Sequence, residues 1–216
     1  GYITPQEFNL FANQAQMEIF ERYFYDINQL RRAPGNDSEY SDPLDMLEEK
    51  ISFFEKYKVA MSAVSGNQAT LPTDTYRLGT VFYGAAGYDV EKVGKKELEY
   101  MLRQKLTSPV DKRPVYNRKS STQLKVFPSS PSSSYSTSNV TCNYIAKPTT
   151  VVWGYAVINE QALYNATTST DFALHGSEET TLVMKILELA GVTIKQPDIV
   201  QFAAQEDLQK TQLEKQ

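Results

Sequence analysis

The sequence predicts an α+β protein with an N-terminal helical hairpin, a central, mostly antiparallel β-rich region containing one short helix, and two C-terminal helices. Apolar residues recur at three- and four-residue steps near both ends of the chain, which indicates helices. Between them, β-branched and aromatic residues form short runs separated by Gly and Pro, which indicates strands. We expect these regions to span residues 1–57, 58–170 and 171–216, in one compact domain with extended arms. A chain of 216 residues is long enough to bury a core.

The first predicted helix begins at a strong N-terminal signal. Thr4 is an N-cap residue, Pro5 occupies the first helical position and Glu7 completes a capping box. One helical face is then apolar, and it contains Phe8, Phe11, Ala12, Ala15, Ile19, Tyr23, Ile27 and Leu30. Pro34-Gly35 ends this helix and Asp42-Pro43 begins the second. The apolar face of the second helix contains Leu44, Leu47, Ile51 and Phe54.

After Lys58 the pattern changes to that of strands. The predicted strands are residues 59–61, 75–83, 88–93, 114–117, 123–127, 140–147 and 150–158, with a short helix at 95–106. Seven of the ten residues from 129 to 138 are Ser, so this stretch predicts a flexible insertion between two strands.

Two helices are predicted to close the chain. Ser177 caps the first, whose apolar residues end at Gly191 as a C′ residue. Pro197 begins the second, which becomes mostly polar after Ala204. Two interpretations of residues 205–216 stay open. They form a solvated end, or an arm that places Leu208 and Leu213 in a groove of a neighbouring subunit.

The cysteine and histidine contents narrow the chemistry. The single cysteine, Cys142, cannot form an internal disulfide, and the single histidine, His175, is the one histidine available as a general base. Asp171 and Ser177 are close to His175 in sequence, but a catalytic triad requires convergence in space, which sequence neighbours rarely achieve. We therefore expect no catalytic residue, no metal site, no cofactor and no enzymatic activity.

Two further motifs have simple structural explanations. Residues 1–8 match the second half of an EF-hand calcium loop, but the capping box explains Thr4 and Glu7 with residues that are present. The stretch Gly84-Ala85-Ala86-Gly87 lacks the Lys-Ser/Thr pair of a phosphate-binding loop and predicts a hairpin turn.

The chain also has no apolar run long enough to cross a membrane, so we expect a soluble protein.

Charge is distributed unevenly along the chain. Residues 1–57 contain 11 acids and 5 bases, whereas residues 92–125 contain 10 bases and 3 acids. The candidate interface residues of the basic region are Lys95, Lys96, Arg103, Lys105, Lys112, Arg113, Arg118 and Lys119. Three interpretations are open: a solvated surface, an interface with the acidic surface of another copy, and a surface facing the phosphates of DNA. The net charge of −4 argues against a dedicated nucleic-acid-binding protein.

Three stretches carry a family resemblance: TPQEFNLFANQAQMEIFERYFYDIN at 4–28, LPTDTYRLGTVFY at 71–83 and FALHGSEETTLVMKILELAGVTIKQPDIVQFAAQEDLQ at 172–209. Together they resemble virion structural proteins of tailed bacteriophages, in particular crAss-like and related short-tailed phages. The resemblance implies a subunit of the head-to-tail connector, an adaptor or ring protein of twelve copies around the portal axis, and it supplies no catalytic residues.

The implied partners are other copies of the chain, the portal protein, and tail or second ring proteins, with non-specific contact to phage DNA. The implied location is the virion, assembled in the cytoplasm of the bacterial host. Another tail or minor capsid component of the same virion is the alternative role, and a nucleic-acid-binding module is a more distant one.

Overall fold

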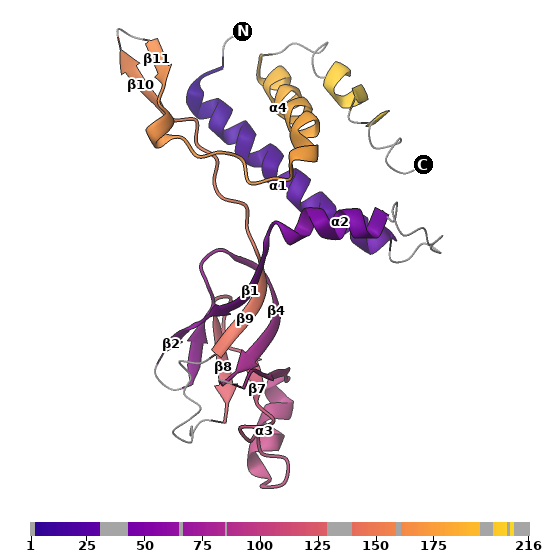
Figure 1. Cartoon of the computed structure of the whole chain (residues 1–216), viewed down its shortest axis with the longest axis vertical. Coiled ribbons are helices and arrows are strands. Elements are labelled where there is room, and N and C mark those ends of the chain that lie inside the picture. The colour runs from indigo at the N-terminus through magenta and orange to yellow at the C-terminus, as the bar shows by residue number, and fades with distance from the viewer. Residues whose placement is uncertain are drawn as a thin grey trace. The chain divides into compact units, whose positions relative to one another are not determined.

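A computed structural model describes residues 3–30, 43–64, 67–84, 86–128, 140–158, 161–194, 201–206 and 208–209. The chain divides into two compact units (Figure 1). Unit 1 contains residues 1–53 and 148–216, and unit 2 contains residues 54–147. Helices dominate unit 1 and sheets dominate unit 2, so the predicted α+β class is confirmed. The Ser-rich stretch 129–138 lies outside the described residues.

Unit 1 is built on the long helix α1, Pro5–Leu30. Its predicted capping box is present, because the Thr4 N–H donates to Glu7 Oε2 at 2.8 Å and the Glu7 N–H donates to Thr4 Oγ1 at 3.3 Å. The buried face of α1 contains Ala12, Ala15, Gln16, Ile19, Phe20 and Tyr23. Helix α2, Pro43–Ser52, and helix α4, Glu179–Ile194, both pack against α1 (Figure 1).

The ends of α2 and α4 differ from the prediction. Phe54 lies beyond the end of α2 and belongs to unit 2. A short 3-10 turn, η3 at Gly176–Glu178, precedes α4, and its N-cap is His175 rather than Ser177. Helix α4 also continues three residues past Gly191, which is buried, so tertiary packing overrides the preference of glycine for a helix end. The predicted helix start at Pro197 lies outside the described residues, and residues 201–206 are helical.

Residues 148–170 return the chain to unit 1. Strands β10, Tyr155–Ile158, and β11, Gln161–Tyr164, form an antiparallel hairpin that pairs Tyr155 with Tyr164. The predicted strand 150–158 is therefore half right, and β11 was not predicted. Residues 166–168 form a 3-10 turn, η2 at Ala166–Thr168, and Val152 pairs with Thr170 in an isolated bridge.

The described residues of unit 2 form two sheets. The first has the order β1-β9-β4-β5, and its strands are β1 (Glu55–Ala60), β9 (Val140–Ala146), β4 (Thr75–Tyr83) and β5 (Tyr88–Asp89). The second has the order β2-β3-β8-β7-β6, and its strands are β2 (Ser62–Val64), β3 (Gln68–Thr70), β8 (Gln123–Phe127), β7 (Val115–Arg118) and β6 (Glu91–Lys92). All strand pairs are antiparallel except β6 with β7.

The core of unit 2 lies between these sheets. Cys142 on β9 is opposite Val59 of β1 and Val81 of β4, and the buried and half-buried residues of β9 alternate along the strand. Leu124 and Val126 of β8 join the same cluster from the second sheet. Helix α3, Lys95–Arg103, covers part of the second sheet by packing Leu98 against Val115 and Phe127. It ends three residues earlier than predicted, at the extended residue Gln104. In the part of the chain that the structure describes, no helix has the length and apolarity to cross a membrane.

Candidate interaction surfaces

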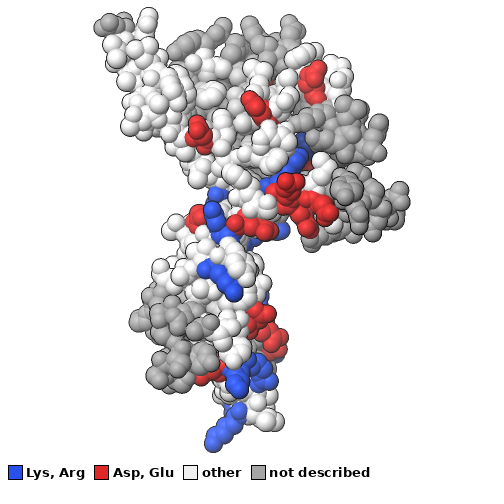
Figure 2. All heavy atoms as spheres, viewed as in Figure 1, with Lys and Arg blue, Asp and Glu red and all other residues white. Residues whose placement is uncertain are grey.

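The eight predicted basic residues all lie in unit 2 and are all exposed. We call them the basic surface, and they are Lys95, Lys96 and Arg103 on α3, Lys105, Lys112 and Arg113 in the following loop, and Arg118 and Lys119 at the end of β7. Figure 2 shows Lys and Arg side chains at the end of unit 2 that contains α3.

Internal contacts hold three members of the basic surface. Arg118 donates to the carbonyl oxygens of Ser120 and Ser121 at 3.2 and 2.9 Å. Arg113 donates to the Thr107 carbonyl at 3.5 Å, and Lys119 donates to Gln68 Oε1 at 2.7 Å. The other five, Lys95, Lys96, Arg103, Lys105 and Lys112, form no hydrogen bond or ion pair with any described residue. Their charges are therefore available to a partner.

Apolar side chains are exposed along the same part of the chain. Leu106 is 92% exposed, and Tyr100, Val110 and Leu102 are also exposed. A single exposed apolar residue is ordinary, but four within eleven residues of a basic segment are typical of a surface that another molecule covers. Tyr in particular suits the centre of an interface, because it combines a large apolar ring with a polar hydroxyl group.

The two units carry opposite net charges. Unit 2 contains 14 Lys and Arg against 7 Asp and Glu, a net charge of +7. Unit 1 contains 8 Lys and Arg against 19 Asp and Glu, a net charge of −11. The net charge of the whole chain, −4, is therefore the sum of two larger net charges of opposite sign.

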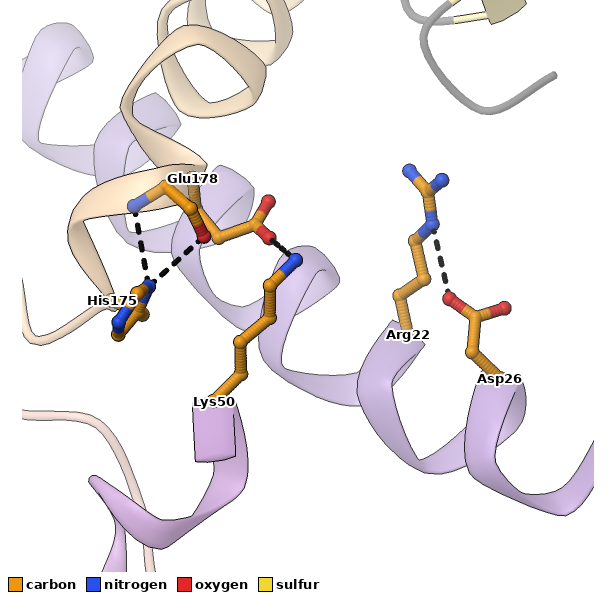
Figure 3. Close-up of polar contacts among 6 residues, drawn as sticks. Arg22, Asp26, Lys50, His175 and Glu178 are labelled. Atoms are coloured by element: carbon orange, nitrogen blue, oxygen red, sulfur yellow. Dashed lines mark hydrogen bonds and ion pairs between the residues drawn. The ribbon is translucent and has the colours of Figure 1, made fainter. Parts of the chain in front are cut away.

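The described bases of unit 1 are all paired inside the unit. Lys50 Nζ contacts Glu178 Oε1 at 2.5 Å, and Arg22 contacts Asp26 at 3.5 Å (Figure 3). Lys185 lies 3.7 Å from Glu18. Helices α1 and α2 carry exposed acids, and we call Glu21 of α1 with Asp45 and Glu49 of α2 the acidic surface.

His175 serves as a cap. Its Nδ1 accepts the Ser177 N–H at 3.3 Å and lies 3.0 Å from Ser177 Oγ. Among the described residues, Asp171 makes no hydrogen bond to the ring, so the three groups are not arranged as a triad. The hydrogen bonds of the ring cap the short turn before α4.

Cys142 is fully buried in the core of unit 2. Burial, with a smaller contribution from the negative charge of Asp74, raises the pKa of its thiol to about 11. The thiol is therefore protonated at neutral pH and is a poor nucleophile. Over the described ranges, no group of three or more His, Cys, Asp or Glu side chains is placed to hold a metal ion.

Three side-chain amides of α1 form hydrogen bonds with a segment of the main chain that is distant in sequence. These contacts were not predicted from the sequence. Asn9, Asn13 and Gln16 bond to the main chain of the extended residues 149–153, and we call these three residues the amide ladder. Asn13 both donates to the Val151 carbonyl and accepts the Val151 N–H, each at 2.8 Å. Polar amides at spacings of four and three residues, next to an apolar helical face, were the available signal.

The amide ladder also positions an aromatic cluster. Asn9 Oδ1 accepts the main-chain N–H of Trp153 at 2.6 Å. The Trp153 ring stacks on the rings of Tyr155 and Tyr164, whose centroids lie 6.0 and 6.2 Å from its own. Phe8 contacts the same ring edge-to-face. Beyond this cluster the β10–β11 hairpin exposes Val157, Ile158 and Leu163. The C-terminal candidate Leu208 is 62% exposed, and Leu213 lies outside the described residues.

The chain matches no model of a known protein family, and a search of curated proteins finds no match.

Proposed function

We propose that this chain is a virion structural protein of a tailed bacteriophage, a ring subunit of the head-to-tail connector. In this role it joins portal and tail and forms part of the DNA channel, without catalysing a reaction. The observation that carries the proposal is the opposite net charge of the two units, +7 and −11, on one chain. The resemblance of residues 4–28, 71–83 and 172–209 to connector proteins supplies the biological setting.

Opposite charges on one chain suit the contact that a ring requires. A ring requires a heterologous interface, in which one patch of each subunit meets a different patch of the next. Contact between two basic surfaces, or between two acidic ones, is repulsive, whereas contact between the basic and the acidic surface is attractive. The exposed Tyr100, Leu102 and Leu106 supply apolar area for the centre of such an interface.

The same surfaces also suit another tail or minor capsid component, which is the alternative role. A dedicated nucleic-acid-binding module is less well supported, because the whole chain is acidic and only unit 2 has a net positive charge.

Charge reversal tests the proposed interface. We expect Lys95→Glu, Lys96→Glu and Arg103→Glu together to abolish association at low salt, measured as particle mass in solution. Raised salt should weaken association of the unmodified chain in the same way, because exposed charges are screened.

The matched control reverses three exposed bases of unit 2 outside the basic surface, Lys56→Glu, Lys125→Glu and Lys147→Glu. It changes the net charge equally and should retain association. Adding Glu21→Lys, Asp45→Lys and Glu49→Lys to the α3 triple variant should restore self-association. Equal effects of the two triple variants would reject the interface, and so would association that ignores both charge and salt.

A further inference from the structure

A groove of about 390 Å³ opens in unit 2 where its two sheets meet. It is lined by Tyr76, Arg77 and Leu78 of β4, Lys92 of β6, and Tyr116 and Arg118 of β7. Strand β4 belongs to the first sheet, and β6 and β7 belong to the second, so each sheet supplies one wall. This volume lies in the range of small-molecule sites, about 300–1,000 Å³.

Strand pairing places the lining residues. Lys92 on β6 lies opposite Tyr116 on β7, and side chains of directly paired residues share one face of a sheet. Arg118 is two residues beyond Tyr116 and therefore lies on that same face. Tyr116 itself is 7% exposed and packs in the core between the sheets. Because core packing fixes the register, the groove is formed in advance of any ligand.

The lining carries three positive charges and no carboxylate. Arg77, Lys92 and Arg118 are all exposed at the groove, so they can contact a ligand. The bonds from Arg118 to the carbonyls of Ser120 and Ser121 orient its guanidinium group. A planar guanidinium matches the geometry of phosphate oxygens, and a second and third cation nearby strengthen the attraction for an anion.

Two tyrosines add an aromatic component. Burial raises the pKa of the Tyr116 phenol, against a smaller opposing effect of the Arg118 charge, so the hydroxyl stays protonated at neutral pH. Tyr76 and Tyr116 both line the groove beside the cations. Tyr116 is packed in the core, so the half-buried Tyr76 is the one of the two whose ring can stack on a ligand. Nucleotide sites combine aromatic side chains with basic side chains. The aromatic ring stacks on the nucleobase, and the cationic groups bind the phosphate.

We propose that this groove is a nucleotide site, which binds a phosphate group together with its aromatic base. A free mononucleotide and a nucleotide within a single nucleic-acid strand share this chemistry. The site goes beyond the proposed connector function and does not depend on it, because all of its residues belong to one chain and one unit.

The test uses the full chain and isothermal titration calorimetry with three probes: AMP, a mixed-sequence single-stranded oligonucleotide and inorganic phosphate. We expect AMP or the oligonucleotide to bind more tightly than inorganic phosphate. Arg77→Gln, Lys92→Gln and Arg118→Gln should each weaken that binding about tenfold or more, as for a lost hydrogen bond to a charged group. Arg118→Lys keeps the positive charge but lacks the planar guanidinium group. It should therefore restore only part of the affinity that Arg118→Gln loses.

Lys125→Gln is the matched control. Lys125 is exposed on β8 and pairs with Asn117, the residue between Tyr116 and Arg118, so it lies on the opposite face of the same sheet. It should change affinity less than twofold. Binding of AMP assigns the site to free nucleotides, and binding of the oligonucleotide alone assigns it to strands. The proposal is overturned if no probe binds, if inorganic phosphate binds as tightly as both AMP and the oligonucleotide, or if Lys125→Gln weakens binding as much as the groove variants.

Discussion

Replacement of Asn13 by Ala removes the central contact of the amide ladder. The Val151 side chain and main chain are enclosed, with 4% of the residue exposed, and both its N–H and its C=O bond only to the Asn13 amide among the described residues. A buried main-chain group left without a partner costs about 1–3 kcal/mol. The higher helix propensity of alanine offsets about 0.5 kcal/mol of this loss of stability. Allowing for partial hydration of the two orphaned groups, we expect Asn13→Ala to lower the free energy of unfolding by about 2–3 kcal/mol.

Trp153 provides a local probe for this measurement. It is the only Trp of the chain, and its main-chain N–H donates to Oδ1 of Asn9, the adjacent member of the amide ladder. Urea unfolding followed by Trp fluorescence therefore reports on the segment that the substitution releases. The control is Gln14→Ala on the same helix, because the Gln14 amide is exposed and, within the described part of the chain, bonds only to Glu18, at 3.0 Å. That change should stay within about 0.5 kcal/mol. Equal midpoints for the two variants would refute the role of the amide ladder.

Three further substitutions test local packing and ionisation. Gly154→Ala should destabilise unit 1 by several kcal/mol, because the added Cβ would lie too close to the hydroxyl oxygen and main chain of Thr168. Gly176→Ala is the control. Its Cβ would meet open space, so thermal unfolding should be nearly unchanged. Burial and a hydrogen bond to Asp74 raise the pKa of Tyr144 from 10.0 to about 12, so stability should fall as pH rises through that window. Tyr144→Phe should lose part of this fall in urea titrations, and an identical fall in both proteins would contradict the assignment.

Local signals predicted much of the fold. The capping box and apolar face of α1 are short-range patterns, and the predicted bounds of β4 and β8 match the structure. Strands β2 and β3 have only three residues each, too few for an alternating pattern to stand out. The predicted strand at 88–93 is divided between β5 and β6, which belong to different sheets, and the choice of sheet depends on distant partners.

The surfaces could be predicted only where neighbouring residues build them. The basic surface was evident because its residues are close in sequence. The amide ladder joins Asn13 to Val151, 138 residues away, and no local pattern identifies such a partner. The nucleotide groove combines Arg118, which belongs to the basic surface, with Arg77 and Lys92 from other strands. Their convergence depends on the pairing and packing of two sheets rather than on sequence spacing.

The mass and symmetry of the assembled particle test the central claim most directly. Native mass spectrometry and electron microscopy of the full chain at low salt would measure both. We expect a closed ring of twelve copies, with twelve times the 24.4 kDa mass of one chain, that dissociates as salt is raised. A chain that stays monomeric across the accessible concentrations, or that forms only a two-fold dimer indifferent to salt, would contradict the proposed function.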